Sequence, residues 1–284
     1  MSRRPLSATD HRRDAAGLTY VYPVVSRRAG GVSVGINLNP NNACNWRCLY
    51  CQVPELKRGS APVLDVARLE TELRQFLEEV LHGDFMRERV PEGARRLMDI
   101  ALSGNGEPTT AREFPEVVAV AARVMAEFKL RGRIKLVLIT NGSMMHRPGV
   151  QHALDVMRES NGEVWFKIDR ATPAGMSAVN GVRGSVKRTM ANLAVCAARC
   201  PTWIQTCMFA LDGAVPGEGE VRAYLDMLGS LRREHIKIEG VLLYGLARPS
   251  LQPEAGRLSA LPKRWLEGLA DEIESRGYRV RLTP

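Results

Sequence analysis

The 284-residue chain lacks several features, and each absence argues against a class of protein. It has no long apolar run: the stretch from Val117 to Ala126 is far shorter than the roughly 18 residues of a membrane span, and it contains Arg123. No apolar segment follows the basic amino terminus, so we expect neither a secretory signal nor membrane association, and we expect a cytoplasmic protein. Six cysteines in that compartment indicate reduced thiols, metal ligands or catalytic groups rather than disulfides.

The sequence also lacks a linker rich in Pro, Gly or Ser, a repeat of fixed period and a block of like charges. One large domain is therefore expected. The formal net charge of +9 favours an anionic partner such as nucleic acid, a nucleotide or an acidic electron donor. A basic protein without such a partner is the alternative.

After residue 30, short apolar runs alternate with amphipathic segments, a pattern typical of βα units around a parallel sheet. Strands are predicted at 32–39, 98–104, 133–140, 163–169, 202–211 and 235–244, and helices at 66–82, 115–130, 150–159, 186–199 and 219–233. Six units are too few to close an eight-stranded barrel. We therefore predict an α/β fold, a partial (β/α)6 TIM-like barrel over residues 31–284, in which a helix at 262–276 and a short strand extend the carboxyl end. Residues 1–30 are expected to form a basic leader without periodicity.

The first predicted strand has two different faces. Val32, Val34 and Ile36 alternate with smaller or polar residues such as Ser33 and Gly35. In a barrel the apolar face would meet the helices, and the other face would point into the lumen.

Directly after this strand the sequence reads CNWRCLYC, with cysteines at Cys44, Cys48 and Cys51. A structural zinc site normally has four ligands, and no nearby Cys or His supplies the fourth. Three thiolates suit a cubane iron–sulfur cluster whose fourth iron keeps an open position for a substrate or cofactor.

This loop resembles the signature of the radical S-adenosylmethionine (radical SAM) superfamily, in which cysteines are separated by three and two residues and an aromatic residue, here Tyr50, precedes the last. The resemblance implies a [4Fe-4S] cluster held by the three cysteines, with S-adenosylmethionine on the fourth iron. It further implies reductive cleavage of that cofactor to a 5′-deoxyadenosyl radical, which abstracts hydrogen from a substrate. A small donor such as flavodoxin or ferredoxin would supply the electron.

The second predicted strand runs into a glycine turn, Gly104, Asn105, Gly106 and Glu107. It resembles the superfamily's Gly-Gly-Glu segment, which implies a site for the cofactor's amino group, although Asn separates the glycines here. Glycines at a turn also allow the backbone to approach a ligand closely.

Further cofactor contacts are expected at Asn141, Lys167, Asp169 and Gln205. Asn141 belongs to a TNG segment found in many members, although Asn-Gly is also a common turn. Alternation in the fourth strand sends Lys167 and Asp169 inward, where they would meet the cofactor or substrate or form a structural ion pair. Gln205 is expected to make a polar contact with the ligand.

Other candidates leave alternatives open. Tyr244 sits where the superfamily closes around adenine, and Arg248 is either an anion contact or a solvated loop residue. Lys237 and Glu239 share one face of the sixth strand, and the pattern does not fix which way it points. Three further cysteines are either buried thiols or a second redox site: Cys196, Cys200 and Cys207.

INLNPNNACNWRCLYCQVPEL, LSGNGEPT and WFKIDRATP together look most like the Fe–S oxidoreductase group that includes wyosine tRNA-modification enzymes. The substrate does not carry over from this resemblance. A small molecule, a peptide and a tRNA base all remain open, as does a non-catalytic metal-binding or nucleic-acid-binding protein.

Overall fold

The computed structural model describes residues 6–7, 16–26 and 29–284. Eight strands form one curved sheet in the order β1-β2-β5-β6-β7-β8-β10-β12. The strand β1 runs antiparallel to β2, and the other neighbours are parallel. The sheet strands are β1 (Val21–Ser26), β2 (Gly31–Asn37), β5 (Leu97–Ser103), β6 (Lys135–Thr140), β7 (Gly162–Lys167), β8 (Thr202–Cys207), β10 (Gly240–Tyr244) and β12 (Val280–Thr283).

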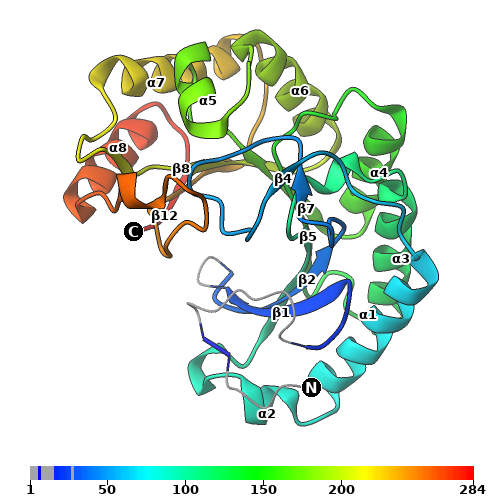
Figure 1. Ribbon diagram of the computed structural model, residues 1–284. Helices are drawn as coiled ribbons and strands as arrows, with labels where there is room; N and C mark the ends of the chain where they lie inside the picture. The colour runs from blue at the N-terminus through cyan, green and yellow to red at the C-terminus, as the bar shows by residue number, and fades with distance from the viewer. Residues whose placement is uncertain (1–5, 8–15, 27–28) are drawn as a thin grey trace.

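Helices cover the outer side of this arc, as Figure 1 shows. They are α1 (Val66–Leu81), α2 (Phe85–Arg89), α3 (Phe114–Glu127), α4 (Pro148–Glu159), α5 (Pro173–Asn180), α6 (Val186–Arg199), α7 (Glu218–Arg233) and α8 (Lys263–Ser275). The small elements are β3 (Ala43–Cys44), β4 (Lys57–Arg58), β9 (Ala210–Leu211), β11 (Leu258–Ser259), η1 (Glu92–Ala94), η2 (Pro108–Thr110) and η3 (Ala255–Arg257). The predicted partial TIM-like barrel is confirmed.

The sixth predicted strand, 235–244, begins later than expected, at Gly240. His235 has a φ of 56°, which turns the chain out of α7 before the strand can start. Lys237 and Glu239 precede the strand and are exposed, so neither lies in the lumen.

The first strand lies within the stretch that we expected to be a leader. Val21–Ser26 forms β1 at the edge of the sheet, which corrects that expectation for these residues. Five of its six residues are buried, so both faces are covered and the sequence shows no alternation. Pro23 is compatible with an edge strand, where the missing N–H breaks no ladder on the open side. Residues 1–5, 8–15 and 27–28 of the predicted leader lie outside the described part of the chain.

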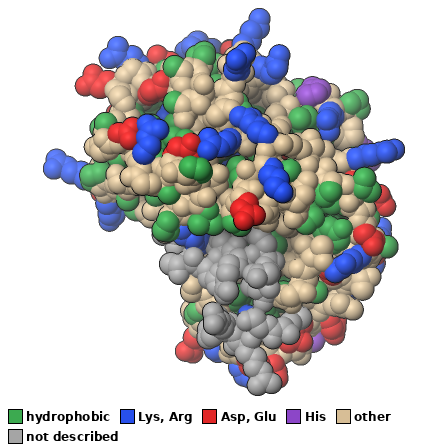
Figure 2. All heavy atoms as spheres, in the orientation of Figure 1, with side chains coloured by type: hydrophobic (Ala, Val, Ile, Leu, Met, Phe, Trp, Pro, Cys, Tyr) green, Lys and Arg blue, Asp and Glu red, His purple; other side chains and the backbone are tan. Residues whose placement is uncertain are grey.

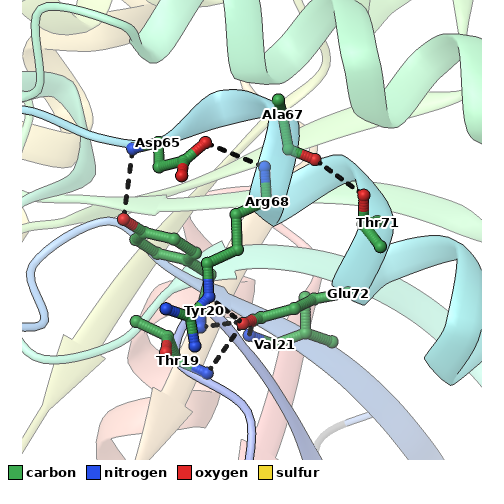
Figure 3. Close-up of polar contacts among 8 residues, drawn as sticks. All are labelled: Thr19, Tyr20, Val21, Asp65, Ala67, Arg68, Thr71 and Glu72. Carbon is green, nitrogen blue, oxygen red and sulfur yellow. Dashed lines mark hydrogen bonds and ion pairs between the residues drawn. The ribbon is translucent and has the colours of Figure 1, made fainter.

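A buried carboxylate on α1 fastens this edge strand (Figure 3). Glu72 is 5% exposed and accepts hydrogen bonds from the backbone N–H groups of Thr19, Tyr20 and Val21 at 3.1, 2.7 and 3.3 Å. Arg68 donates to the same carboxylate at 3.0 Å. Glu72 thus satisfies backbone donors that would otherwise be buried without partners.

The two faces of the sheet are as the alternation predicts. Val32, Val34 and Ile36 pack in the main core with the helices, whereas Ser33 and Gly35 line a cavity in the lumen. The Tyr22 ring from β1 lies so close to Gly35 that a Cβ there would come within 2.2 Å of it. No helix in the described residues combines the length and apolar character that a membrane crossing requires.

Candidate functional site

The cysteine loop follows β2 and lies over the lumen. Cys44, Cys48 and Cys51 are half-buried and form no disulfide, and all three line the same cavity. The loop is closed at its base by the parallel pairing of β3 with β4. Burial raises the pKa of Cys44 to about 11 and that of Cys48 to about 12. These thiols are therefore neutral on their own, and iron ligation would convert them to thiolates.

The donor set fits a cluster. Within the described residues, no three ligating side chains converge on a single metal ion. A cubane does not need such convergence, because each cysteine binds a different iron.

The predicted glycine turn packs directly against the cysteine loop. Gly104 has a φ of +126°, and a Cβ there would lie 2.4 Å from Asn37 Oδ1. At Gly106 a Cβ would lie 2.1 Å from the carbonyl oxygen of Ala43, next to Cys44. Only glycine permits both approaches. Gly104, Asn105, Gly106 and Glu107 all line the cavity.

Glu107 joins the ends of two strands. Its Oε1 accepts hydrogen bonds from Thr109 N, Thr109 Oγ1 and Thr140 Oγ1, and its Oε2 accepts from Asn141 N at 2.6 Å. Burial raises the pKa of this carboxyl group, although those hydrogen bonds oppose the shift. The carboxylate is therefore occupied by donors of the chain itself, and it fixes the shape of the turn.

Asn141 and Lys167 also line the cavity. The Asn141 carboxamide donates to Asn45 Oδ1 at 2.8 Å and so connects the end of β6 to the cysteine loop. The Lys167 ammonium lies 4.8 Å from the centre of the Tyr50 ring. Burial acts to lower the pKa of Lys167, but the acidic groups of Tyr244 and Asp169 outweigh it and hold that pKa above its usual range.

Asp169 differs from the expectation that it contacts the cofactor. It is 1% exposed and is absent from the residues that line the cavity. Its carboxylate accepts hydrogen bonds from the Tyr50 hydroxyl, from Asn180 Nδ2 at 2.7 Å and from Cys207 N at 2.9 Å. β7 ends at Lys167, so the alternation of the strand no longer governs Asp169, and its side chain bonds to the Tyr50 hydroxyl instead of lining the cavity.

Gln205 has the strongest indication of a ligand. It lines the cavity and is 1% exposed, yet neither Oε1 nor Nε2 has a hydrogen-bond partner in the described structure. An unsatisfied buried polar group costs about 1–3 kcal/mol. A bound molecule with a donor and an acceptor would remove that cost.

A family comparison decides the assignment: the model of the radical SAM superfamily matches residues 38–228, more than half of the chain. The chain belongs to the radical SAM superfamily. It is therefore an enzyme of the radical SAM type, with a [4Fe-4S] cluster and S-adenosylmethionine as its cofactors.

Two relatives of this radical SAM chain are UPF0026 proteins. It is 27% identical to the UPF0026 protein of Helicobacter pylori (strain ATCC 700392 / 26695) over 137 residues, which cover 46% of this chain and 37% of the relative. A UPF0026 protein of Synechocystis sp. is 27% identical over 161 residues, 56% of this chain and 52% of that protein. The chain thus matches about half or less of these relatives' length.

Solved radical SAM structures share the fold. TYW1 with a lysine-pyruvate adduct bound has a TM-score of 0.55 at 12% identity, with 94% of this chain and 78% of that chain covered. A radical SAM methyltransferase from Sphaerobacter thermophilus has a TM-score of 0.55 at 13% identity, with 89% and 66% covered. At these identities the likeness is one of fold alone.

The structure adds contacts to the radical SAM loop that the sequence did not indicate. The carbonyl oxygen of Cys51 accepts hydrogen bonds from Leu251 N at 2.9 Å, Ser250 Oγ at 3.2 Å and Gln252 Nε2 at 3.2 Å. About 200 residues separate the partners, and no local pattern identifies such a pair. We call residues 250–252 the clasp.

Among the remaining candidates, Tyr244 and Arg248 line the cavity, as does Cys207. Cys196 and Cys200 are buried near the end of α6, and Cys196 contacts Thr202 Oγ1 at 3.4 Å. These two thiols are not among the residues that line the cavity.

Proposed function

We propose that this chain cleaves S-adenosylmethionine reductively and uses the resulting radical to abstract hydrogen from a substrate. The observation that carries the proposal is the packing of the Gly104–Glu107 turn against a loop whose three cysteines face one cavity. When bound, the cluster would supply the one-electron reduction that cleaves S-adenosylmethionine, and hydrogen abstraction from the substrate would follow. An external one-electron donor is required, and flavodoxin or ferredoxin belongs to the expected class.

In this proposal the chain holds and orients the cofactors. Cys44, Cys48 and Cys51 would hold the cluster through their thiolates, and S-adenosylmethionine would bind beside it. The Gly104–Glu107 turn would bind the cofactor's amino group, and the Lys167 cation would compensate its carboxylate.

Tyr50, Asn141 and Gln205 complete the proposed cofactor contacts. Gln205 is supported by its unpaired carboxamide. Asp169 contributes indirectly, because it holds the hydroxyl of Tyr50. Burial of the cavity beneath the loop would limit the access of solvent to a radical.

Anaerobic reconstitution with iron and sulfide, followed by dithionite and S-adenosylmethionine, tests the proposal through 5′-deoxyadenosine measured by mass spectrometry. The wild-type chain should bind about four irons and form 5′-deoxyadenosine. Cys48→Ala should lose both, because it removes one thiolate of the three. Cys196→Ala is the matched control, because it makes the same substitution at a cysteine outside the cavity. This variant should still bind iron and form 5′-deoxyadenosine. An intact cluster without 5′-deoxyadenosine formation would sink the proposal.

The substrate class is decided by a separate experiment. Figure 2 shows basic side chains spread over the visible face with acidic ones between them. Binding of tRNA should weaken steeply with salt, because neutralised phosphates release counterions. A small-molecule or peptide substrate should show little salt dependence. We place the activity in the cytoplasm, where the cysteines stay reduced.

A further inference from the structure

One side chain outside the described site reaches a cluster cysteine. Asn180, the last residue of α5, is 1% exposed, and its Nδ2 donates to Cys48 Sγ at 3.4 Å and to Asp169 Oδ2 at 2.7 Å. A carboxamide nitrogen carries two N–H groups. Both are thus directed at named acceptors.

The orientation of this carboxamide is determined by Asp169. A carboxylate only accepts hydrogen bonds, so it would repel the oxygen of Asn180 and attracts the nitrogen. Its position is fixed in turn by Tyr50 and by the backbone N–H of Cys207. Because the amide group is planar, the N–H that donates to Asp169 fixes the direction of the second N–H of Asn180, which points at Cys48 Sγ.

The backbone around Asn180 is fitted to the same loop. Arg47 N donates to Asn180 O at 3.0 Å, and Leu49 N donates to Val179 O at 2.9 Å, so the two residues that flank Cys48 are both held. The next residue, Gly181, has a φ of 63°, and a Cβ there would lie 2.9 Å from the carbonyl oxygen of Arg47. The end of α5 therefore sets the position of Cys48.

We propose that Asn180 is a positioning residue that tunes the cluster: its hydrogen bond to Cys48 Sγ raises the cluster's reduction potential. This inference rests on the cluster of the proposed function. Hydrogen bonds to cluster sulfurs are one determinant of iron–sulfur potentials. A reduced cluster carries one more electron, so the N–H···S bond is stronger in the reduced state and favours it. Cys44 accepts a comparable bond from the backbone N–H of Trp46 at 3.4 Å, which no substitution removes cleanly.

Asn180→Leu tests the inference, because leucine keeps the branched shape and removes the donor. The full chain is reconstituted anaerobically, iron and sulfide are quantified, and the midpoint potential is measured by EPR-monitored titration without S-adenosylmethionine. Asn180→Ala is the second variant. Asn41→Leu is the control, since Asn41 donates to Ser60 O and accepts from Ala43 N in the same loop but bonds to no cysteine sulfur.

We expect Asn180→Leu to keep its iron and to show a more negative midpoint potential than the wild type, while Asn41→Leu does not shift. A complete cluster with an unchanged potential would overturn the inference. Folded Asn180→Leu and Asn180→Ala chains that take up no iron would also overturn it, because Asn180 would then serve only the structure of the loop. If the wild-type chain forms no cluster, the proposed function is contradicted. If the wild-type cluster forms but does not cleave S-adenosylmethionine, the proposed function is again contradicted, but the comparison of midpoint potentials still tests the role of Asn180.

Discussion

Glu107→Gln should destabilise the chain by removing one acceptor from a buried junction. In the wild type, two backbone N–H groups and two hydroxyl groups donate to the carboxylate. The threonine hydroxyls can rotate and accept from an amide, whereas the N–H groups of Thr109 and Asn141 cannot. Whichever way the substituted amide is oriented, its NH2 group faces one of those N–H groups.

The expected loss is the cost of one unsatisfied buried donor, about 1–3 kcal/mol, plus weaker bonds to a neutral acceptor. Removing a buried charge offsets part of it, in keeping with the raised pKa of Glu107. We therefore expect a loss of about 2 kcal/mol in the free energy of unfolding.

Urea unfolding followed by circular dichroism, under reducing conditions, measures this change. Glu116→Gln is the matched control, because Glu116 is an exposed residue of α3, and it should stay within about 0.5 kcal/mol of the wild type. A Glu107→Gln chain with wild-type stability and an unchanged m-value would refute the conclusion that the carboxylate holds the turn through its hydrogen bonds.

Three further predictions concern the frame of the site. Gly142→Ala should destabilise the chain by about 2–4 kcal/mol in urea unfolding, because φ is +72° and the new Cβ would lie 2.0 Å from Phe166. Gly229→Ala is the control: it lies in the interior of α7, its new Cβ would have its nearest atom at 3.5 Å, and it should stabilise the chain by about 0.5–1 kcal/mol. Gln252→Ala should speed the loss of the cluster to a chelator by about threefold to tenfold, since it removes hydrogen bonds to Cys51 O and Val53 O. Gln151→Ala, which removes from α4 a donor to Met145 O, should leave the rate unchanged. Equal rates in the two variants would contradict the role of the clasp. Burial raises the pKa of Cys196 to about 12, so the stability that this thiol contributes is present below its ordinary pKa of 9.0 and is lost as pH rises toward 12. Between pH 8 and 10 the free energy of unfolding of the wild type should fall by about 1.4 kcal/mol more than that of Cys196→Ala. Equal falls in the two chains would argue against burial of the thiol.

Local patterns predicted the barrel and the centre of the site. Alternation in β2 and β7 separated the helix-facing side from the lumen, because the two faces meet chemically different surroundings. The cysteine spacing and the Gly104–Glu107 turn required no long-range knowledge, since each lies within one loop. The position of Lys167 in the cavity followed from the same period.

Contacts between distant segments could not be predicted in this way. Asn180 and the clasp meet the cysteine loop from 132 and about 200 residues away. Nothing in their own neighbourhood distinguishes them from ordinary polar residues at a helix end or in a loop. The edge strand β1 was not predicted for a different reason: it is buried on both faces, so its sequence has no alternation of apolar and polar residues.

The open sheet has a consequence for which ligands the lumen accepts. In a closed barrel, strand number and stagger fix the diameter. Here β1 and β12 are the two ends of the described sheet, so no ladder of hydrogen bonds sets the distance between them. The Tyr22 ring of β1 lines this lumen, and its hydroxyl hydrogen-bonds with Ser103 Oγ of β5 at 2.8 Å. A smaller side chain at that position would enlarge the lumen at its β1 edge and so admit a larger molecule.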